Sequence, residues 1–355
     1  MSASPQELIR PEVLALSAYQ VPDAAGMVKL DAMENPYRLA EALQDEIAQL
    51  CRSAQINRYP DAHASLLKAR LRTTMAIPAG ADVLVGNGSD EIIQIVEMCV
   101  AKPGAVIMGV EPSFVMFRMI AANVGAKYVG VPLKADFSLD AQAMREALAA
   151  HRPALVFLAY PNNPTGNLFD RNEVSSIISS APGLVVVDEA YHAFAGESFM
   201  PELAQHEDLL VMRTVSKLGL AGLRLGMLAG SARWLREFDK ARLPYNVNVL
   251  TQLIAASVLA HPDALERQAA RIRSERERVY QALTAVAGVD AFKSSANFIL
   301  FRVADALKVF EGLKRRKVLI KNLHGSHPQL AGCLRVTVGT PQENEIFLSA
   351  LRACL

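Results

Sequence analysis

The chain has 355 residues, with 37 Lys and Arg against 36 Asp and Glu, and 51% of its residues are hydrophobic. A formal net charge of +1 excludes the concentrated positive field that nucleic acid or an anionic membrane surface requires. The apolar content excludes disorder over most of the chain, and the length predicts one large domain with a smaller one beside it.

Neither the cysteines nor the N-terminus indicates a secreted or membrane-bound protein. The four cysteines are far apart and have no metal-binding or redox spacing, so we expect reduced thiols and no metal site. The N-terminus has no basic run followed by an apolar core, and no apolar stretch approaches the roughly 20 residues of a membrane span. We therefore expect a cytoplasmic protein.

Segments with strand and helix character alternate through the first two thirds of the chain. The predicted strands are nearly continuous apolar runs bounded by Gly, Pro or Asp: Asp82–Gly86, Ala105–Gly109, Ala126–Val131, Ala154–Tyr160, Leu184–Asp188 and Leu209–Arg213. The predicted helices between them are Glu91–Ala101, Ser113–Val124, Asp140–Ala150 and Arg171–Ser180. This alternation predicts an α/β fold with a mostly parallel sheet wrapped by helices.

The pattern changes after about Tyr245. A long charged amphipathic helix is predicted over Asp263–Ala287, followed by two strands, an intervening helix and a last helix from Glu343: the strands are Phe298–Val303 and Leu334–Val338, and the intervening helix is Ala306–Arg316. We predict a large domain over residues 35–250. The small α+β domain is expected over 251–355, joined by the N-terminal residues 1–34.

The first motif is Gly86–Glu91, which follows a predicted strand and opens a predicted helix. Free amides at a helix N-terminus, with glycines that allow close approach, form a phosphate cradle. The motif is not a dinucleotide fingerprint, because Glu91 stands where the third glycine belongs. An ordinary turn with Ser89 as the helix N-cap is the alternative.

Two further motifs lie at the carboxyl ends of predicted strands, where ligands bind in open α/β sheets. In Tyr160–Gly166, two prolines and a glycine stiffen a loop that holds the amide of Asn163. In Asp188–Tyr191, an acid at the end of an apolar run requires a cation or hydrogen bonds in order to ionise. A bare turn and a structural salt bridge are the respective alternatives.

The fourth motif is Ser216-Lys217, followed by Gly219, Gly222 and Arg224. Desolvation beside an apolar strand lowers the pKa of a lysine toward nucleophilic use, and an arginine offers a forked donor to a phosphate. An ordinary surface lysine is the alternative. Together the four motifs supply the groups that pyridoxal 5′-phosphate requires, including a carboxylate for its pyridinium nitrogen.

With these motifs, the chain resembles the fold-type I aminotransferases and, within them, the histidinol-phosphate aminotransferases. The resemblance extends from about Tyr19 to Thr340. Besides the four motifs, the matching segments in this range are Asn57–Asp61, Gly222–Arg224 and Leu334–Gly339. It implies a large domain with a mostly parallel seven-stranded sheet, and a smaller α+β domain. It also implies catalytic roles: Lys217 forms the Schiff base and moves the substrate proton, Asp188 pairs with the pyridine nitrogen, and Tyr191 and Asn163 contact the ring hydroxyl.

The resemblance assigns the remaining cofactor contacts as well. The cofactor phosphate is expected to contact the backbone amides around Gly88, Ser89 and Asp90 at a helix N-terminus. It is also expected to contact the side chains of Ser216 and Arg224. Phe117 is expected to stack on the cofactor ring. Tyr59 is expected to reach the cofactor of a neighbouring subunit, which makes a homodimer part of the mechanism.

For the substrate, the resemblance implies that Arg335 binds the anionic end, with Tyr19 and Lys321 near the substrate phosphate and Asn35 near the entrance. Three features differ from the usual family pattern. Lys217 and Arg224 are one residue closer in sequence, Lys321 stands where a second arginine is common, and Phe117 replaces a commoner tyrosine.

The implied reaction is transamination between L-histidinol phosphate and 2-oxoglutarate, giving imidazole acetol phosphate and L-glutamate in histidine biosynthesis. An aromatic amino acid aminotransferase and a threonine-phosphate decarboxylase of the same fold are alternatives. A ligand-sensing domain without turnover is disfavoured because no DNA-binding module accompanies it, and a nicotinamide dehydrogenase is disfavoured by Glu91.

Overall fold

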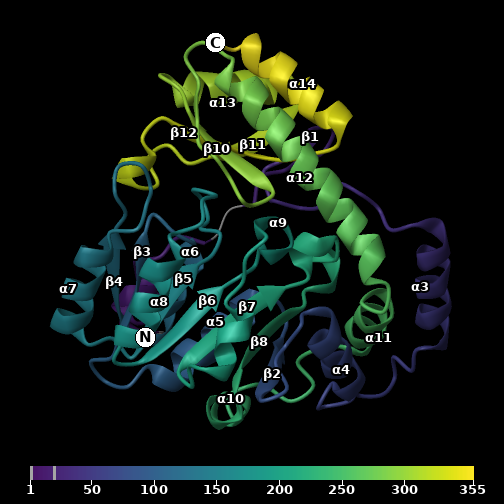
Figure 1. Ribbon diagram of the computed structural model, residues 1–355, viewed down its shortest axis with the longest axis vertical. Coiled ribbons are helices and arrows are strands. Elements are labelled where there is room, and N and C mark those ends of the chain that lie inside the picture. Colours follow the sequence, from purple (N-terminus) through teal and green to yellow (C-terminus); the bar gives the residue numbers. More distant parts are fainter. Residues whose placement is uncertain (1–2, 19–20) are drawn as a thin grey trace.

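Seven strands form the larger of two sheets in the computed structural model, which describes residues 3–18 and 21–355 (Figure 1). In spatial order they are β2 (Ala81–Gly86), β8 (Gly226–Ser231), β7 (Leu209–Thr214), β6 (Leu184–Asp188), β5 (Leu155–Ala159), β3 (Val106–Glu111) and β4 (Lys127–Pro132). All neighbours are parallel except β8, which is antiparallel to β2 and β7. The mostly parallel sheet is confirmed, and the six predicted strands lie within two residues of the observed ones.

Helices cover both faces of this sheet because its strands are apolar on both sides. On β6, Val185 and Val187 pack into one core cluster, whereas Leu184 and Val186 pack into the other. The helices from the N-terminus through this region are α1 (Pro5–Leu8), α2 (Pro11–Leu14), α3 (Glu41–Ser53), α4 (Ser65–Thr74), α5 (Ser89–Val100), α6 (Val115–Val124), α7 (Ala141–His151), α8 (Arg171–Ser180), α9 (His192–Ala195), α10 (Ala232–Asp239) and α11 (Val249–Val258).

The smaller sheet joins the two ends of the chain. Its order is β1 (Val28–Leu30), β11 (Val318–Asn322), β12 (Cys333–Thr337), β10 (Phe298–Arg302) and β9 (Asp290–Ala291), with β1 parallel to β11 and the other pairs antiparallel. Three helices pack on it: α12 (Pro262–Thr284), α13 (Ala306–Arg315) and α14 (Pro341–Arg352). A small α+β unit is therefore present.

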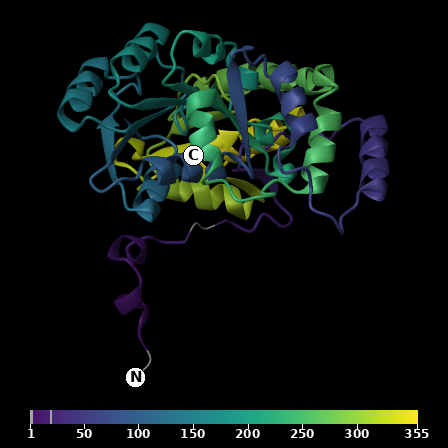
Figure 2. The ribbon, with the colours of Figure 1, turned by 90° about the horizontal axis from the view of Figure 1, so that it is seen from below.

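The long helix α12 runs from the large-sheet unit to the small one (Figure 1). Helix α11 still packs on α3 and α4, so the change between units comes in α12, later than the boundary predicted after residue 250. Residues 3–18, which carry α1 and α2, lie at the periphery of the molecule in Figure 2. There α2 contacts α6, and the Arg10 guanidinium donates to the carbonyl oxygen of Asn123.

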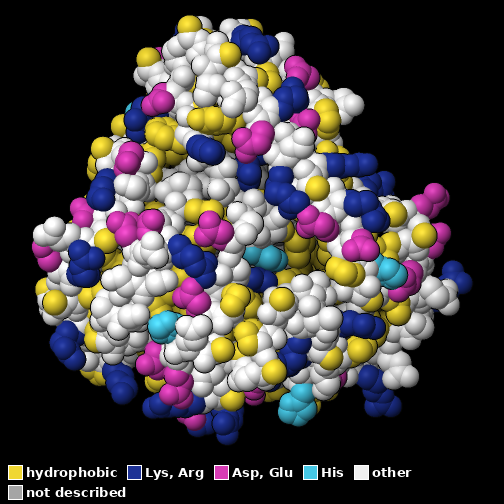
Figure 3. Space-filling view, in the orientation of Figure 1, with side chains coloured by type: hydrophobic (Ala, Val, Ile, Leu, Met, Phe, Trp, Pro, Cys, Tyr) yellow, Lys and Arg dark blue, Asp and Glu magenta, His cyan; other side chains and the backbone are white. Residues whose placement is uncertain are grey.

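Charges of both signs are interspersed over the face shown in Figure 3, in keeping with the balanced composition. Over residues 3–18 and 21–355, no helix is long and apolar enough to cross a membrane. In the same part of the chain, no group of three or more His, Cys, Asp or Glu side chains could hold a metal ion.

One buried acid predicts a pH-dependent stability. Glu97 on α5 is fully buried, and no described residue hydrogen-bonds either carboxylate oxygen. Burial raises its pKa from 4.5 to about 9, so the native carboxyl stays protonated where the unfolded chain has lost the proton. We expect the free energy of unfolding to fall as pH rises from about 4.5 to 9, and Glu97→Gln to be more stable than wild type by about 3 kcal/mol at pH 7.

Urea unfolding of both chains at pH 5 and pH 8, in one cofactor state, measures this difference. The advantage of the glutamine variant should grow between the two pH values. An advantage that does not change with pH would contradict the assignment.

Candidate active site

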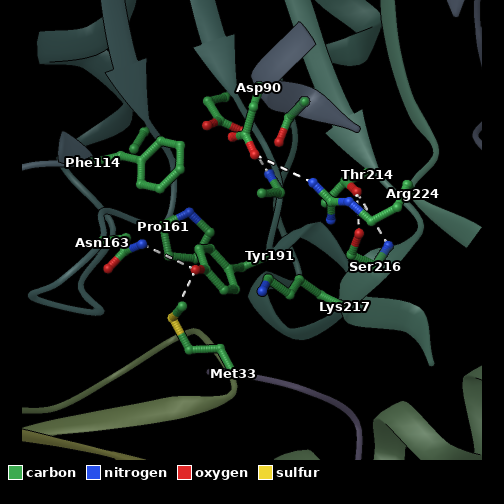
Figure 4. Close-up of a pocket in the computed structure, with 14 residues that line it drawn as sticks. Met33, Asp90, Phe114, Pro161, Asn163, Tyr191, Thr214, Ser216, Lys217 and Arg224 are labelled. Carbon is green, nitrogen blue, oxygen red and sulfur yellow. Dashed lines mark hydrogen bonds and ion pairs between the residues drawn. The ribbon is translucent and has the colours of Figure 1, made fainter. Parts of the chain in front are cut away.

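A pocket opens at the carboxyl ends of the parallel strands, where all four predicted motifs converge (Figure 4). Asp188 ends β6, Asn163 follows β5 and Lys217 follows β7, and all three line the pocket. Strands in parallel register end at one edge of the sheet, which is why motifs far apart in the sequence meet here.

The Gly86–Glu91 motif is the turn between β2 and α5, and Ser89 is the first residue of α5. Gly88 adopts φ +88, and a Cβ atom built there would lie 2.8 Å from Arg224 Nη2, so a side chain would fill the cradle. Glu91 supports the turn, because its carboxylate accepts hydrogen bonds from Asn87 N and Asn246 Nδ2, both at 2.6 Å. Glu91 thus has a structural role where a dinucleotide fingerprint has glycine.

Arg224 reaches this cradle despite the shortened spacing after Lys217. Its Nη2 lies 3.3 Å from Asp90 Oδ2, and Arg224, Asp90 and Ser89 all line the pocket. Ser216 lies on the same side, where its hydroxyl accepts a hydrogen bond from Thr214 (2.9 Å). A guanidinium, hydroxyl groups and a helix N-terminus form a donor set for a phosphate.

Asp188 is 4% exposed, and burial raises its pKa to about 7. Within the described part of the chain, the Asp188 carboxylate accepts one hydrogen bond, from Ala190 N to Oδ1 (3.0 Å). No ion pair of residues 3–18 and 21–355 includes Asp188, so a structural salt bridge does not account for it. A cationic ring nitrogen beside this carboxylate would lower its pKa and keep the nitrogen protonated.

Lys217 lies in the short 3-10 turn Ser216–Leu218, with its amine directed into the pocket. Burial, with a smaller contribution from the positive charge of Arg335, lowers its pKa to about 8. The amine donates to the carbonyl oxygen of Ala32 (3.3 Å) and lies 5.9 Å from the centre of the Tyr191 ring. A substantial neutral fraction near physiological pH suits a base and a nucleophile.

Asn163 connects the cofactor side of the pocket with the small sheet. Its Nδ2 donates to the Tyr191 hydroxyl (3.2 Å), and its Oδ1 accepts from Arg335 Nη1 (2.5 Å). Arg335 is 5% exposed and also donates to the carbonyl oxygen of Asp31 (3.2 Å). Lys321 is the direct cross-strand partner of Arg335, so both residues face the same side of the sheet.

Two expectations for the substrate end differ from the geometry or lie outside it. Asn35 does not line the pocket, because its amide donates to Gln268 on α12 (2.9 Å) and accepts from Tyr37 N (2.9 Å). It therefore holds the N-terminal segment against α12. Tyr19 lies outside the described residues.

The expectation for Phe117 is wrong. Phe117 is 0% exposed and stacks on Phe157 of β5, with ring centroids 4.4 Å apart, inside the core. Phe114 lines the pocket instead, because it stands immediately before α6 whereas Phe117 faces the sheet. The sequence signal was the pair of aromatic residues three positions apart, and only the start of the helix decides which one faces the pocket.

Tyr59 does not line the pocket of its own chain. Its side chain is 80% exposed and stacks on Tyr245, with ring centroids 4.4 Å apart. Sequence reasoning also missed Met33, which lines the pocket and accepts a hydrogen bond from Tyr191 at Sδ (3.0 Å). No sequence signal singles out this methionine.

A buried ion pair supports the pocket from behind. Arg213 donates from Nε (2.9 Å) and Nη2 (2.8 Å) to Glu189 Oε2, and its Nη1 donates to the carbonyl oxygen of Met75 (2.9 Å). Glu189 follows Asp188, and Arg213 lies four residues before Lys217. The pair therefore ties together the two strand ends that carry the acid and the lysine.

Comparisons with known proteins show the family of the chain. The family described as aminotransferase class I and II matches residues 25–351. The chain is 55% identical over 353 residues to histidinol-phosphate aminotransferase 1 of Ralstonia nicotianae, covering 98% of this chain and 94% of the relative. It is 52% identical to histidinol-phosphate aminotransferase of Chromobacterium violaceum, with 99% of each chain covered.

The fold is shared with a solved structure, histidinol-phosphate aminotransferase from Sinorhizobium meliloti in complex with pyridoxal 5′-phosphate. The TM-score is 0.87 at 23% identity, covering 98% of this chain and 97% of that chain, so this likeness concerns the fold. Sequence family, fold and pocket chemistry lead to one conclusion. The chain belongs to the class I and II aminotransferases.

Proposed function

We propose that the chain transfers the amino group of L-histidinol phosphate to 2-oxoglutarate, giving imidazole acetol phosphate and L-glutamate in histidine biosynthesis. The observation that carries the reaction class is the meeting of the buried Asp188 carboxylate and the half-buried Lys217 amine in one pocket, with Arg335 hydrogen-bonded to the pocket residue Asn163. The relatives above 50% identity, which are named for histidinol phosphate, support the choice of substrate. A cytoplasmic location is in keeping with this role.

The cofactor is pyridoxal 5′-phosphate, and the residues present fit it. The cradle closed by Gly88 and Arg224 offers donors to its phosphate, and Asp188 offers a carboxylate to its ring nitrogen. Asn163 and Tyr191, which are hydrogen-bonded to each other, offer an amide and a phenol to the ring hydroxyl, and this supports the proposal. When bound, the cofactor supplies an electron sink for the charge that develops at the substrate α-carbon.

The chain's own residues then act on the substrate. Lys217, neutral in part because of its lowered pKa, would accept the proton from the substrate α-carbon and hold it on its amine for return. Arg335 binds the anionic group of either amino donor, since a planar fork suits both phosphate and carboxylate. Lys321, its cross-strand partner, adds positive charge on the same face of the small sheet.

The visible spectrum of the cofactor-loaded enzyme tests the proposed function. L-histidinol phosphate added without a keto acid should bleach the yellow colour at low concentration, and phenylalanine should do so only at much higher concentration. Bleaching by aromatic amino acids alone would assign the chain to the aromatic alternative. Mass analysis of the product excludes or identifies a decarboxylase, because decarboxylation removes CO₂ and transamination does not.

A homodimer, with Tyr59 of each subunit reaching the other active site, is also part of the proposal. The exposed side chains Ile56 (75%), Tyr59 (80%) and Leu243 (71%), with Tyr245 beside them, support a covered apolar surface at this position. Tyr59→Ala is expected to weaken cofactor binding without changing the fold.

Co-expression of Tyr59→Ala and Lys217→Ala chains tests this arrangement. In a mixed dimer one active site carries both defects and the other carries neither, so about a quarter of wild-type activity should return. No recovery in a mixture that contains mixed dimers would contradict a shared site.

A further inference from the structure

Three consecutive residues, 31–33, run along the substrate side of the pocket. The carbonyl oxygen of Asp31 accepts from Arg335 Nη2 (3.2 Å), and that of Ala32 accepts from Lys217 Nζ (3.3 Å). The next residue, Met33, lines the pocket with its side chain. This segment therefore contacts both the cation that is proposed to bind the anionic group and the lysine that is proposed to move the proton.

The backbone of Met33 is held in an unusual conformation. Its φ is +56, in the left-handed region that residues with a Cβ atom rarely adopt because the Cβ atom comes too close to the backbone. Two buried residues of the small sheet unit hold it there: Met33 N donates to Thr337 Oγ1 (2.9 Å), and Asn297 Nδ2 donates to the Met33 carbonyl oxygen (2.9 Å). These two backbone hydrogen bonds therefore fix the direction in which the Cα–Cβ bond of Met33 points.

That direction is into the pocket. Figure 4 shows the Met33 side chain extending toward the Tyr191 hydroxyl, on the opposite side of the pocket from Asp90 at the phosphate cradle. The hydroxyl donates to Met33 Sδ (3.0 Å) and accepts from Asn163 Nδ2 (3.2 Å), while Asn163 Oδ1 accepts from Arg335. A row of hydrogen bonds thus runs from the Arg335 guanidinium through Asn163 and Tyr191 to the uncharged thioether of Met33.

The row divides the space around the substrate α-carbon. Lys217 must reach that carbon, and its amine lies 3.3 Å from the carbonyl oxygen of Ala32, so the carbon lies close to residues 31–33. The anionic substituent is directed to Arg335, on the Asp31 side. The other substituent is left with the Met33 side, where the thioether offers no charge and no donor but makes favourable contacts with flat rings.

We infer that Met33 is a specificity-determining residue, whose thioether forms the wall that receives the aromatic ring of the amino donor and favours it over a charged side chain. This inference rests on the proposed function, in which the ring is the imidazole of histidinol phosphate. The discrimination between L-histidinol phosphate and glutamate is thereby assigned to the uncharged side chain of Met33. Arg335 binds the anionic group of both donors.

Steady-state and single-turnover kinetics of Met33→Ala with each amino donor test the inference. The KM for L-histidinol phosphate should rise about ten- to a hundredfold, the range expected when apolar contact is removed from a substrate pocket, and the value for glutamate should change by less than about threefold. Met33→Leu, which keeps most of the volume, should restore most of the lost affinity. Both variants keep a Cβ atom, so the backbone strain at this position is unchanged.

Two binding measurements separate recognition from damage to the fold. Imidazole acetol phosphate has no amino group to transfer, so its binding can be measured without turnover. Calorimetric titration of the enzyme loaded with pyridoxal 5′-phosphate should show that Met33→Ala binds this compound more weakly than wild type, by the same factor as the rise in KM. The dissociation constant of the cofactor itself should match wild type. Met98→Ala, at a half-exposed methionine on α5, is the matched control and should change none of these values.

The outcomes are distinguishable from a failure of the proposed function. Wild type that transaminates glutamate but not histidinol phosphate contradicts the proposed function before any variant is made. With wild type active on both donors, equal losses for both in Met33→Ala, or no loss for either, overturn the assignment of Met33. A large loss of cofactor affinity in Met33→Ala would also overturn it, because the side chain would then support the cofactor.

Discussion

Lys217→Ala is expected to lower kcat by about four orders of magnitude, since it removes the group that is proposed to move the proton at the substrate α-carbon. The Lys217 amine is directed into the pocket, and burial lowers its pKa to about 8, which matches its proton affinity to this task. The change should be measured with saturating L-histidinol phosphate and 2-oxoglutarate on protein reconstituted with cofactor.

The fold and the cofactor cradle should survive this substitution, because Gly88, Ser216 and Arg224 are untouched. The cofactor is therefore expected to remain bound without the covalent link, and circular dichroism should match wild type. Lys240→Ala, at an exposed lysine paired with Glu237, is the control for loss of a lysine elsewhere. Turnover by Lys217→Ala within tenfold of wild type would refute the role of this residue.

Arg213→Ala is expected to reduce the free energy of unfolding by about 3–5 kcal/mol, because it leaves the Glu189 carboxylate buried without its cation. The side chains of Arg213 and Glu189 are only 7% and 0% exposed, and the guanidinium also binds the carbonyl oxygen of Met75. Activity should fall as well, since the pair holds together the strand ends that carry Asp188 and Lys217. Urea unfolding measures the stability change.

A double variant shows whether the buried charge is the cause. Arg213→Met with Glu189→Leu leaves no unpaired charge, so it should be more stable than either single variant. Arg233→Ala breaks an exposed pair with Glu207 and should change stability by less than about 1 kcal/mol. A double variant as unstable as the sum of the single ones would show that hydrogen bonds, rather than the uncompensated charge, dominate.

Much of the large sheet could be predicted because its strands carry their own signal. Leu184–Asp188 is an apolar run that ends in an acid, and both its limits are observed in β6. By contrast, β8 (Gly226–Ser231) was missed, since its glycines and serine weaken the strand pattern. In the small sheet, β1 and β11 were missed because their pairing joins Val28 with Val318, and so short a strand is specified mainly by its distant partner.

The cofactor motifs could be located from the sequence because each follows a strand whose end is visible in the sequence. Asp188, Asn163 and Lys217 therefore meet at one edge of the sheet, as the parallel order requires. The sequence did not show which groups face the pocket. Phe114 rather than Phe117 lines it, because one turn of helix directs the second ring into the core.

By itself, then, the sequence determined the alternation of strands and helices, which depends on local periodicity, and it located the motifs of the proposed catalytic groups, which local turns and the family resemblance mark along the chain. Only the tertiary structure decided that Arg335 meets Asn163, that Arg213 pairs with Glu189, and that Met33 borders the substrate space. The physical reason is that these contacts join different strands, or the two sheets, and their geometry is set by packing between elements that no local pattern records.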